Sequence, residues 1–126
     1  MPPTVTAETV FPAVPESVGS ARRFTRAALG RQDVDPRLID TAMLLVSELA
    51  TNAIIHAASS VKLRIDVGDD IRVEVSDEDE TPPVVGEPEM EHESGRGLAI
   101  VTTLADDWSW SPRSNGKAVW FSLARN

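Results

Sequence analysis

Three polar residues on one predicted helix have the types and spacing that could do chemistry. Glu48, Asn52 and His56 recur every fourth residue, so they share one side of a helix with about 3.6 residues per turn. They interrupt an otherwise apolar surface. A carboxylate there could accept a proton, and a carboxamide oxygen could bind a hard cation. The alternative is a hydrogen-bonded polar stripe at the edge of the core, because buried polar groups need partners.

Two further motifs follow in the chain. Gly95-Arg96-Gly97 stands between a loop and a predicted helix. Glycines there let a ligand approach the backbone, and the free N–H groups and helix dipole favour an anion such as phosphate. Taken alone, the motif is more typical of a flexible hinge before a helix. Asp77 lies where a predicted strand meets an acidic segment, and such aspartates are usually solvated or form turns.

Hydrophobic periodicity indicates the elements that must position these residues. Asp35 suits the N-cap of the longest helix and Pro36 its first position. Helices are predicted over 17–30, 36–57 and 98–105, and strands over 61–67, 71–76, 108–110 and 117–123, with an optional edge strand within 5–14. This order predicts an α/β (α+β) two-layer sandwich, in which a mostly antiparallel sheet is covered on one face by helices.

Composition and charge narrow the function classes. The 126 residues are 41% hydrophobic and 25% charged, which predicts a single domain over 1–126 with a short N-terminal extension of about ten residues. The absence of cysteine excludes a disulfide framework, an iron–sulfur cluster and a thiol nucleophile. A net charge of −8, with 11 of the 20 acids in 69–93, argues against direct nucleic-acid binding. With no signal peptide and no apolar run near the ~20 residues of a membrane span, we expect a cytoplasmic protein without a membrane partner.

In chain order the motifs form a recognisable series. It consists of E-L-A-T-N-A-I-I-H-A (48–57), V-E-V-S-D (73–77), G-R-G-L-A-I-V (95–101) and G-K-A-V-W-F (116–121). This series resembles the ATP-binding domain of gyrase, heat-shock chaperones, histidine kinases and mismatch-repair ATPases, the GHKL superfamily. Within it, the chain looks most like the anti-sigma-factor regulatory serine kinases, particularly the compact single-domain actinobacterial type. The resemblance covers almost the whole chain.

The resemblance implies a Bergerat-type ATP-binding fold with ATP and Mg²⁺ as cofactors. Asn52 would coordinate Mg²⁺, and Glu48 would act as general base toward the attacking hydroxyl. Asp77 would accept a hydrogen bond from the exocyclic amine of adenine. His56 would be structural support, and residues 78–94 would form the ATP lid. Phosphate would be contacted, chiefly by backbone amides, at the second glycine motif, which consists of Gly95, Arg96, Gly97 and Leu98.

The chain also departs from the family pattern. The first glycine motif is usually D-x-G-x-G, whereas residues 77–81 read D-E-D-E-T. We therefore expect a less pliable backbone there and acids that could repel a triphosphate. Near the last glycine, where many relatives have a threonine, the chain has Lys117 and Ala118. Lys117 could help to hold a phosphate, but a solvated strand lysine is the stronger expectation. ATP binding remains the expectation, while affinity and turnover stay open.

Three functions fit these features. The leading hypothesis is an ATP-dependent serine/threonine protein kinase that restrains a sigma factor and phosphorylates an anti-anti-sigma protein of the STAS type. The alternative is a non-catalytic nucleotide-binding or partner-binding module on a degenerate ATPase fold. An ATP-hydrolysing sensor-kinase fragment ranks below both, because the sequence shows no dimerisation helix with a phosphoacceptor histidine. A homodimer is a further candidate assembly, since relatives often dimerise.

Overall fold

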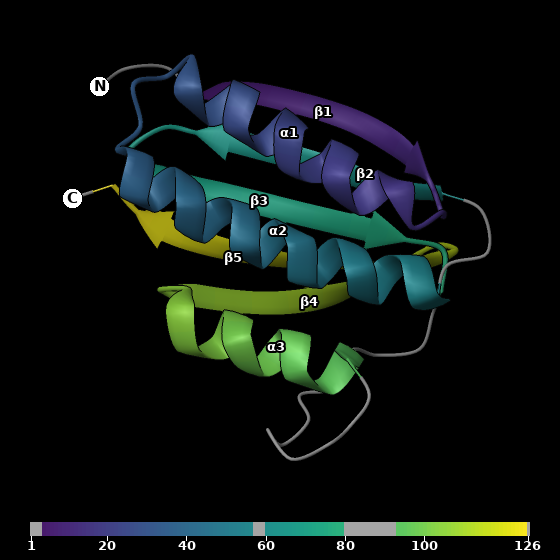
Figure 1. Cartoon of the computed structure of the whole chain (residues 1–126). Coiled ribbons are helices and arrows are strands. Elements are labelled where there is room, and N and C mark those ends of the chain that lie inside the picture. The colour runs from purple at the N-terminus through teal and green to yellow at the C-terminus, as the bar shows by residue number, and fades with distance from the viewer. Residues whose placement is uncertain (1–3, 57–59, 80–92, 126) are drawn as a thin grey trace.

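The computed structural model describes residues 4–56, 60–79 and 93–125, and the side chains of these residues except 56 and 93–98. The helices are α1 (Glu16–Gly30), α2 (Pro36–His56) and α3 (Glu93–Leu104), and the strands are β1 (Val5–Pro12), β2 (Ser60–Val67), β3 (Asp70–Asp77), β4 (Asp107–Arg113) and β5 (Gly116–Ala124). The strands form one sheet in the order β1-β2-β3-β5-β4, and all neighbours are antiparallel. Figure 1 shows the helices as one layer along the sheet. The predicted two-layer sandwich is confirmed.

Helix α2 is the central helix of this layer. It begins as predicted, because the backbone N–H of Arg37 donates to the Asp35 carboxylate over 2.9 Å. Its apolar stripe faces the sheet and is fully buried at Leu45 and Val46. The segment Pro36–Ile55 is long and apolar enough to span a membrane, with a mean hydropathy of 1.5, which differs from the sequence expectation. Part of its apolar surface, including Leu45, Val46 and Leu49, is buried in the core.

The core lies between the helices and one face of the sheet. Along each inner strand, alternate residues point toward the helices, as the period-2 pattern predicts. The buried strand residues are Val61, Leu63, Ile65, Val67, Ile71, Val73, Val75, Val119, Phe121 and Leu123. Phe121, at 0% exposure, is the largest fully buried side chain among the described residues. Asp77 and Lys117 continue the stripes of β3 and β5 at one end of this face.

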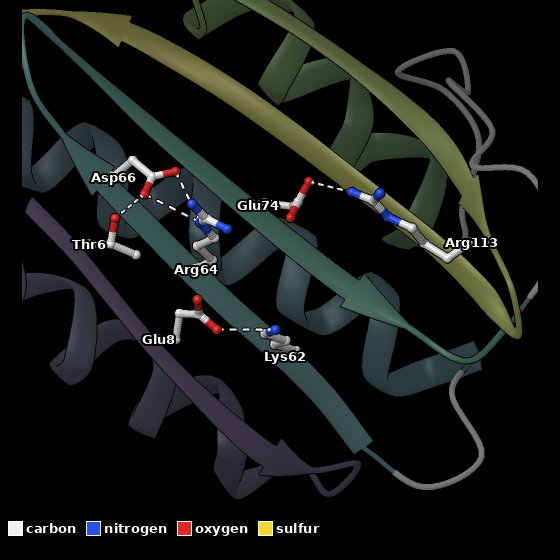
Figure 2. Close-up of polar contacts among 7 residues, drawn as sticks. All are labelled: Thr6, Glu8, Lys62, Arg64, Asp66, Glu74 and Arg113. Atoms are coloured by element: carbon white, nitrogen blue, oxygen red, sulfur yellow. Dashed lines mark hydrogen bonds and ion pairs between the residues drawn. The ribbon is translucent and has the colours of Figure 1, made fainter. Parts of the chain in front are cut away.

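The opposite face of the sheet is polar and charged (Figure 2). Lys62 pairs with Glu8 over 3.0 Å, and Arg113 pairs with Glu74 over 2.9 Å. Asp66 accepts hydrogen bonds from Thr6 Oγ1 and from Arg64 Nε. Exposed pairs of this kind contribute little to stability, about 0–1 kcal/mol each. This face is therefore solvated, and the candidate site residues belong to the helix side.

Three boundaries differ from the sequence predictions by several residues. Residues 5–10, expected as an N-terminal extension with an optional edge strand, belong to β1, which pairs along its full length with β2. Helix α3 starts at Glu93 rather than near 98, so the second glycine motif lies inside it. Strand β4 extends to Arg113 and includes Pro112, which an edge strand tolerates because one side of it needs no ladder bond. The predicted lid, 78–94, lies outside the described residues from 80 to 92.

Candidate functional site

The residues singled out in the sequence lie on elements that meet at one end of the helix layer. Asn52 is near the C-terminal end of α2, Asp77 is the last residue of β3, and Lys117 is the second residue of β5. Helix α2 packs against α3, β3 and β5. In Figure 1, the C-terminal end of α2, the arrowhead of β3 and the start of α3 lie toward the same side. The fold thus gathers the separate motifs into one region.

Asp77 and Lys117 form a buried ion pair. They are direct partners in the β3–β5 register. Nζ of Lys117 lies 3.1 Å from Oδ1 of Asp77, and the two side chains are only 6% and 4% exposed. The expectation of a solvated lysine is therefore wrong. Lys117 alternates with Val119 and Phe121 on the inward face of β5, and this alternation was the sequence signal that could have placed it.

The backbone after β3 folds around this pair. The N–H of Asp79 donates to Oδ1 of Asp77 over 2.9 Å, and the carbonyl oxygen of Asp79 accepts from Nζ of Lys117 over 3.2 Å. The Asp79 carboxylate also faces the same ammonium group at 3.9 Å. Glu78 turns elsewhere and accepts from Oγ of Ser60 over 3.0 Å. The acid at the first glycine position thus meets a cation, which offsets the repulsion expected from sequence.

Gly116 makes the close approach of β3 and β5 possible. A Cβ at this position would overlap the carbonyl oxygen of Asp77 and lie 2.7 Å from Cα of Glu78. Both are backbone atoms, so neither can move without shifting the end of β3. Gly116 is therefore needed for packing, because only a residue without a side chain leaves room for the end of β3, which carries Asp77.

Asn52 has the one unpartnered buried polar atom found among the described side chains. Its Oδ1 is shielded from water and accepts no hydrogen bond. Leaving such an oxygen without a donor costs about 1–3 kcal/mol. A carboxamide oxygen is a suitable ligand for Mg²⁺, a hard cation that prefers oxygen. Asn52 therefore fits the role of a metal ligand, or of an acceptor for another ligand, on an observation of the structure itself.

Glu48 lies one helical turn before Asn52 and is partly buried. Glu48 makes at least one noncovalent contact with another residue of the chain, so it is not a free side chain. Because residues four apart share one side of a helix, the carboxylate and the Asn52 amide project from the same side of α2. His56 ends the helix, and its side chain lies outside the described residues. The predicted pairing of a base and a metal ligand on one helix side is thus compatible with the fold and stays a prediction.

The second glycine motif occupies the first turns of α3. The helix begins at Glu93, so Gly95 and Arg96 belong to its first turn and Gly97 and Leu98 follow. The first four N–H groups of a helix have no partner within it and can bind an anion. Gly95 and Arg96 fall within this set, whereas Gly97 and Leu98 fall just after it. The role of the motif in phosphate contact stays a prediction.

Across residues 4–55, 60–79 and 99–125, the side chains form no cluster of three or more His, Asp or Glu suited to holding a metal ion. The Asn52 oxygen is a single candidate ligand. Mg²⁺ commonly keeps several waters and binds through one or two protein groups plus substrate phosphates. A metal ion at this site would therefore arrive with a phosphate ligand.

Known proteins share this sequence pattern and fold. The profile of the histidine kinase-like ATPase domain matches residues 11–123. The RsbU and RsbW domains of Rv1364c from Mycobacterium tuberculosis match with a TM-score of 0.74 and 18% identity, over 97% of this chain and 32% of that one. The histidine kinase domain of the blue-light activated kinase EL346 from Erythrobacter litoralis matches with a TM-score of 0.51 and 28% identity, over 69% of this chain and 44% of that one.

The nucleotide-free catalytic domain of histidine kinase ThkA is similar along almost its whole length. Its TM-score is 0.54 at 17% identity, over 94% of this chain and 96% of that one. No curated protein matches the chain. The chain spans less than half of the first two solved structures, so their full activities do not transfer with the fold. The profile match, in contrast, covers most of the sequence, and the chain belongs to the histidine kinase-like ATPase domain family of the GHKL superfamily.

Proposed function

We propose that the chain binds ATP with Mg²⁺ and acts as a cytoplasmic regulatory serine/threonine protein kinase with anti-sigma character. The observation that carries the nucleotide part is the buried Oδ1 of Asn52, which has no donor among the described residues. An apolar residue would be more stable at an ordinary core position, so a polar atom left unpaired in this way points to a ligand. The family match supports ATP as that ligand.

Each candidate residue then has a distinct task. Bound Mg²⁺ supplies charge neutralisation for phosphoryl transfer. Asn52 would hold it through Oδ1, and Glu48 would accept the proton of the attacking hydroxyl. Asp77 would accept a hydrogen bond from the exocyclic amine of adenine. The N–H groups in the first turn of α3, including that of Gly95, would bind phosphate.

The regulatory part rests on likeness to one branch of the family. The solved structure with the TM-score of 0.74 includes an RsbW domain, and the motif series resembles anti-sigma regulatory kinases. The proposed partners are a sigma factor, which the protein would restrain, and a STAS-type anti-anti-sigma protein, which it would phosphorylate. Leu44 and Ile55, at 41% and 55% exposure, are exposed apolar side chains on α2, the helix that carries Asn52.

Calorimetric titration tests the nucleotide site. The full chain is titrated with ATP, with and without Mg²⁺, beside Asn52→Ala. We expect saturable, Mg²⁺-dependent binding that weakens at least about tenfold in the variant, since a hydrogen bond or ligand contact to a charged group contributes about 1.5–3 kcal/mol. Thr41→Ala is the matched control, because Thr41 lies on the same helix, three turns away, and only bonds the carbonyl of Arg37. Equal ATP affinity in Asn52→Ala and Thr41→Ala contradicts the role of Asn52.

A labelling assay tests the kinase. The chain is incubated with γ-labelled ATP and STAS-domain proteins from its host. Labelled phosphoserine or phosphothreonine on one of them, lost in Glu48→Gln while ATP still binds, is the expected result. ATP binding without any labelled partner favours a non-catalytic nucleotide-dependent module. The acidic residue at position 79, where the family has glycine, is the specific feature that keeps this second function under consideration.

A further inference from the structure

Lys117 is a buried cation whose task the ATPase pattern does not account for. The residue is 5% exposed and points inward between β5 and the helix layer, in line with Val119 and Phe121. Placing an ammonium group in such an environment is costly unless opposite charge and hydrogen-bond acceptors meet it. Its position opposite Asp77 in the strand register makes a specific role testable.

The contacts of Lys117 hold it in place from two sides. Nζ lies 3.1 Å from Oδ1 of Asp77 and 3.2 Å from the carbonyl oxygen of Asp79. The Asp79 carboxylate adds a weaker attraction at 3.9 Å. The ammonium is thus tied both to the end of β3 and to the backbone beyond it. These two hydrogen bonds hold the ammonium group in one position, because both must break before the side chain can move away.

The same contacts leave the two oxygens of Asp77 unequal. Oδ1 accepts from Lys117 Nζ and from the N–H of Asp79 over 2.9 Å. Oδ2 takes part in no hydrogen bond with the described residues, and it is not among their fully buried unpartnered atoms. A carboxylate oxygen can accept about two hydrogen bonds. Oδ1 therefore accepts two hydrogen bonds within the fold, and Oδ2 can accept a hydrogen bond from a ligand.

We propose that Lys117 is a positioning residue for base recognition: it fixes Oδ1 of Asp77 and so presents Oδ2 to the exocyclic amine of adenine. This inference rests on the proposed ATP site. It assigns the support of this aspartate to a direct ion pair across the β3–β5 register. A carboxylate oxygen only accepts hydrogen bonds, so the site selects a base that donates at this position.

Selection between two bases is the direct consequence. Adenine carries an amine on C6 and an unprotonated N1, whereas hypoxanthine, of the same size, carries a carbonyl oxygen on C6 and a hydrogen on N1. Facing Oδ2, the carbonyl oxygen would meet a second acceptor and make no hydrogen bond. Sites that hydrogen-bond a substrate N–H strongly reject the analogue lacking it, because the site's own polar group is left unpaired. Lys117 should therefore control the ratio of ATP to ITP affinity, beyond its effect on stability.

The test compares ATP and ITP binding to wild type and Lys117→Met by calorimetry. Methionine keeps the length and apolar stem but removes the charge and donors. We expect wild type to prefer ATP by at least about tenfold. In Lys117→Met, ATP affinity should fall about tenfold while ITP affinity changes little, so that the ratio approaches one. A purely structural lysine would lower both affinities together and leave the ratio unchanged.

Defined results overturn the inference. An unchanged ratio in Lys117→Met, or tighter ATP binding by that variant, shows that Lys117 does not present Asp77 to adenine. If circular dichroism shows Lys117→Met to be unfolded, the titrations are repeated in trimethylamine N-oxide, which favours the folded state, with Lys117→Leu as a second neutral variant without donors. A ratio near one in a folded variant supports the inference, and a ratio equal to that of wild type refutes it. Failure of wild type to bind ATP refutes the proposed function as well, whereas wild-type binding with an unchanged Lys117→Met ratio refutes this inference alone.

Discussion

The glycine that lets β3 and β5 meet gives a direct test of the site's architecture. Gly116→Ala would place a methyl group over the carbonyl oxygen of Asp77 and 2.7 Å from Cα of Glu78. Ordinary carbon–carbon contacts lie at about 3.5–4.0 Å, so the backbone must separate by about 1 Å. Gly116 is not in the left-handed region, since no described glycine has a positive φ. The effect of alanine is therefore one of space.

The magnitude follows from what must move. Overpacking in a well-filled region costs about 1–3 kcal/mol, and here the obstacle is backbone, which also aligns the buried pair of Asp77 and Lys117. We expect a loss of about 3 kcal/mol in the free energy of unfolding, or about 10 °C in Tm for a domain of this size. The Asp77–Lys117 distance of 3.1 Å should lengthen as the strand ends part.

Denaturant unfolding, followed by tryptophan fluorescence and by circular dichroism, measures this change. Gly30→Ala is the matched control, because an alanine Cβ there meets nothing within 4 Å at the end of α1. That substitution should be neutral or stabilise by up to about 1 kcal/mol. A Gly116→Ala protein within about 0.5 kcal/mol of wild type would refute the close approach of the two strands.

Three further predictions concern stability, each measured by the same unfolding experiment. Phe121→Ala, at a side chain with 0% exposure, should cost about 3–5 kcal/mol through the cavity it leaves; a loss under about 1 kcal/mol would contradict its central place. Asp35→Ala should cost about 1 kcal/mol because the cap on the Arg37 N–H is lost, whereas Asp35→Asn should keep most of it. Glu74→Ala should cost less than about 1 kcal/mol, because its partner Arg113 is 52% exposed.

Most of the fold could be predicted from the sequence, because the spacing of apolar residues clearly distinguishes helices from strands. The alternation in residues 61–67 and 71–76 predicted the β2–β3 hairpin, and the structure pairs those strands antiparallel. The start of α3 was missed because 93–97 contain two glycines, which have low helix propensity, yet the structure continues the helix through them. Helix α3 packs against α2 and β4, and these tertiary contacts oppose the low helix propensity of the two glycines.

The candidate site was less accessible to sequence reasoning than the fold. Asn52 and Asp77 were identified by type and order, but burial decides their chemistry, and burial is a property of the packed molecule. Lys117 was assigned to solvent because lysines are almost never fully buried without a partner. Its partner, Asp77, is 40 residues away in the chain. Only the β3–β5 register shows that the two charges stand opposite each other.

That register also explains how the chain tolerates an acid where the family has its first glycine. Asp79 contributes its backbone N–H and carbonyl oxygen to the pair, and any residue can supply these groups. Asp33 is the only described non-glycine residue with a positive φ, so the backbone at Asp79 needs no glycine. Its carboxylate, which would repel a triphosphate bound nearby, lies 3.9 Å from Nζ of Lys117. The two departures from the family pattern therefore compensate each other. Lys117 on β5 lies close to the negative charge that Asp79 introduces, and the carbonyl oxygen of Asp79 is one of the two acceptors that meet the buried ammonium group.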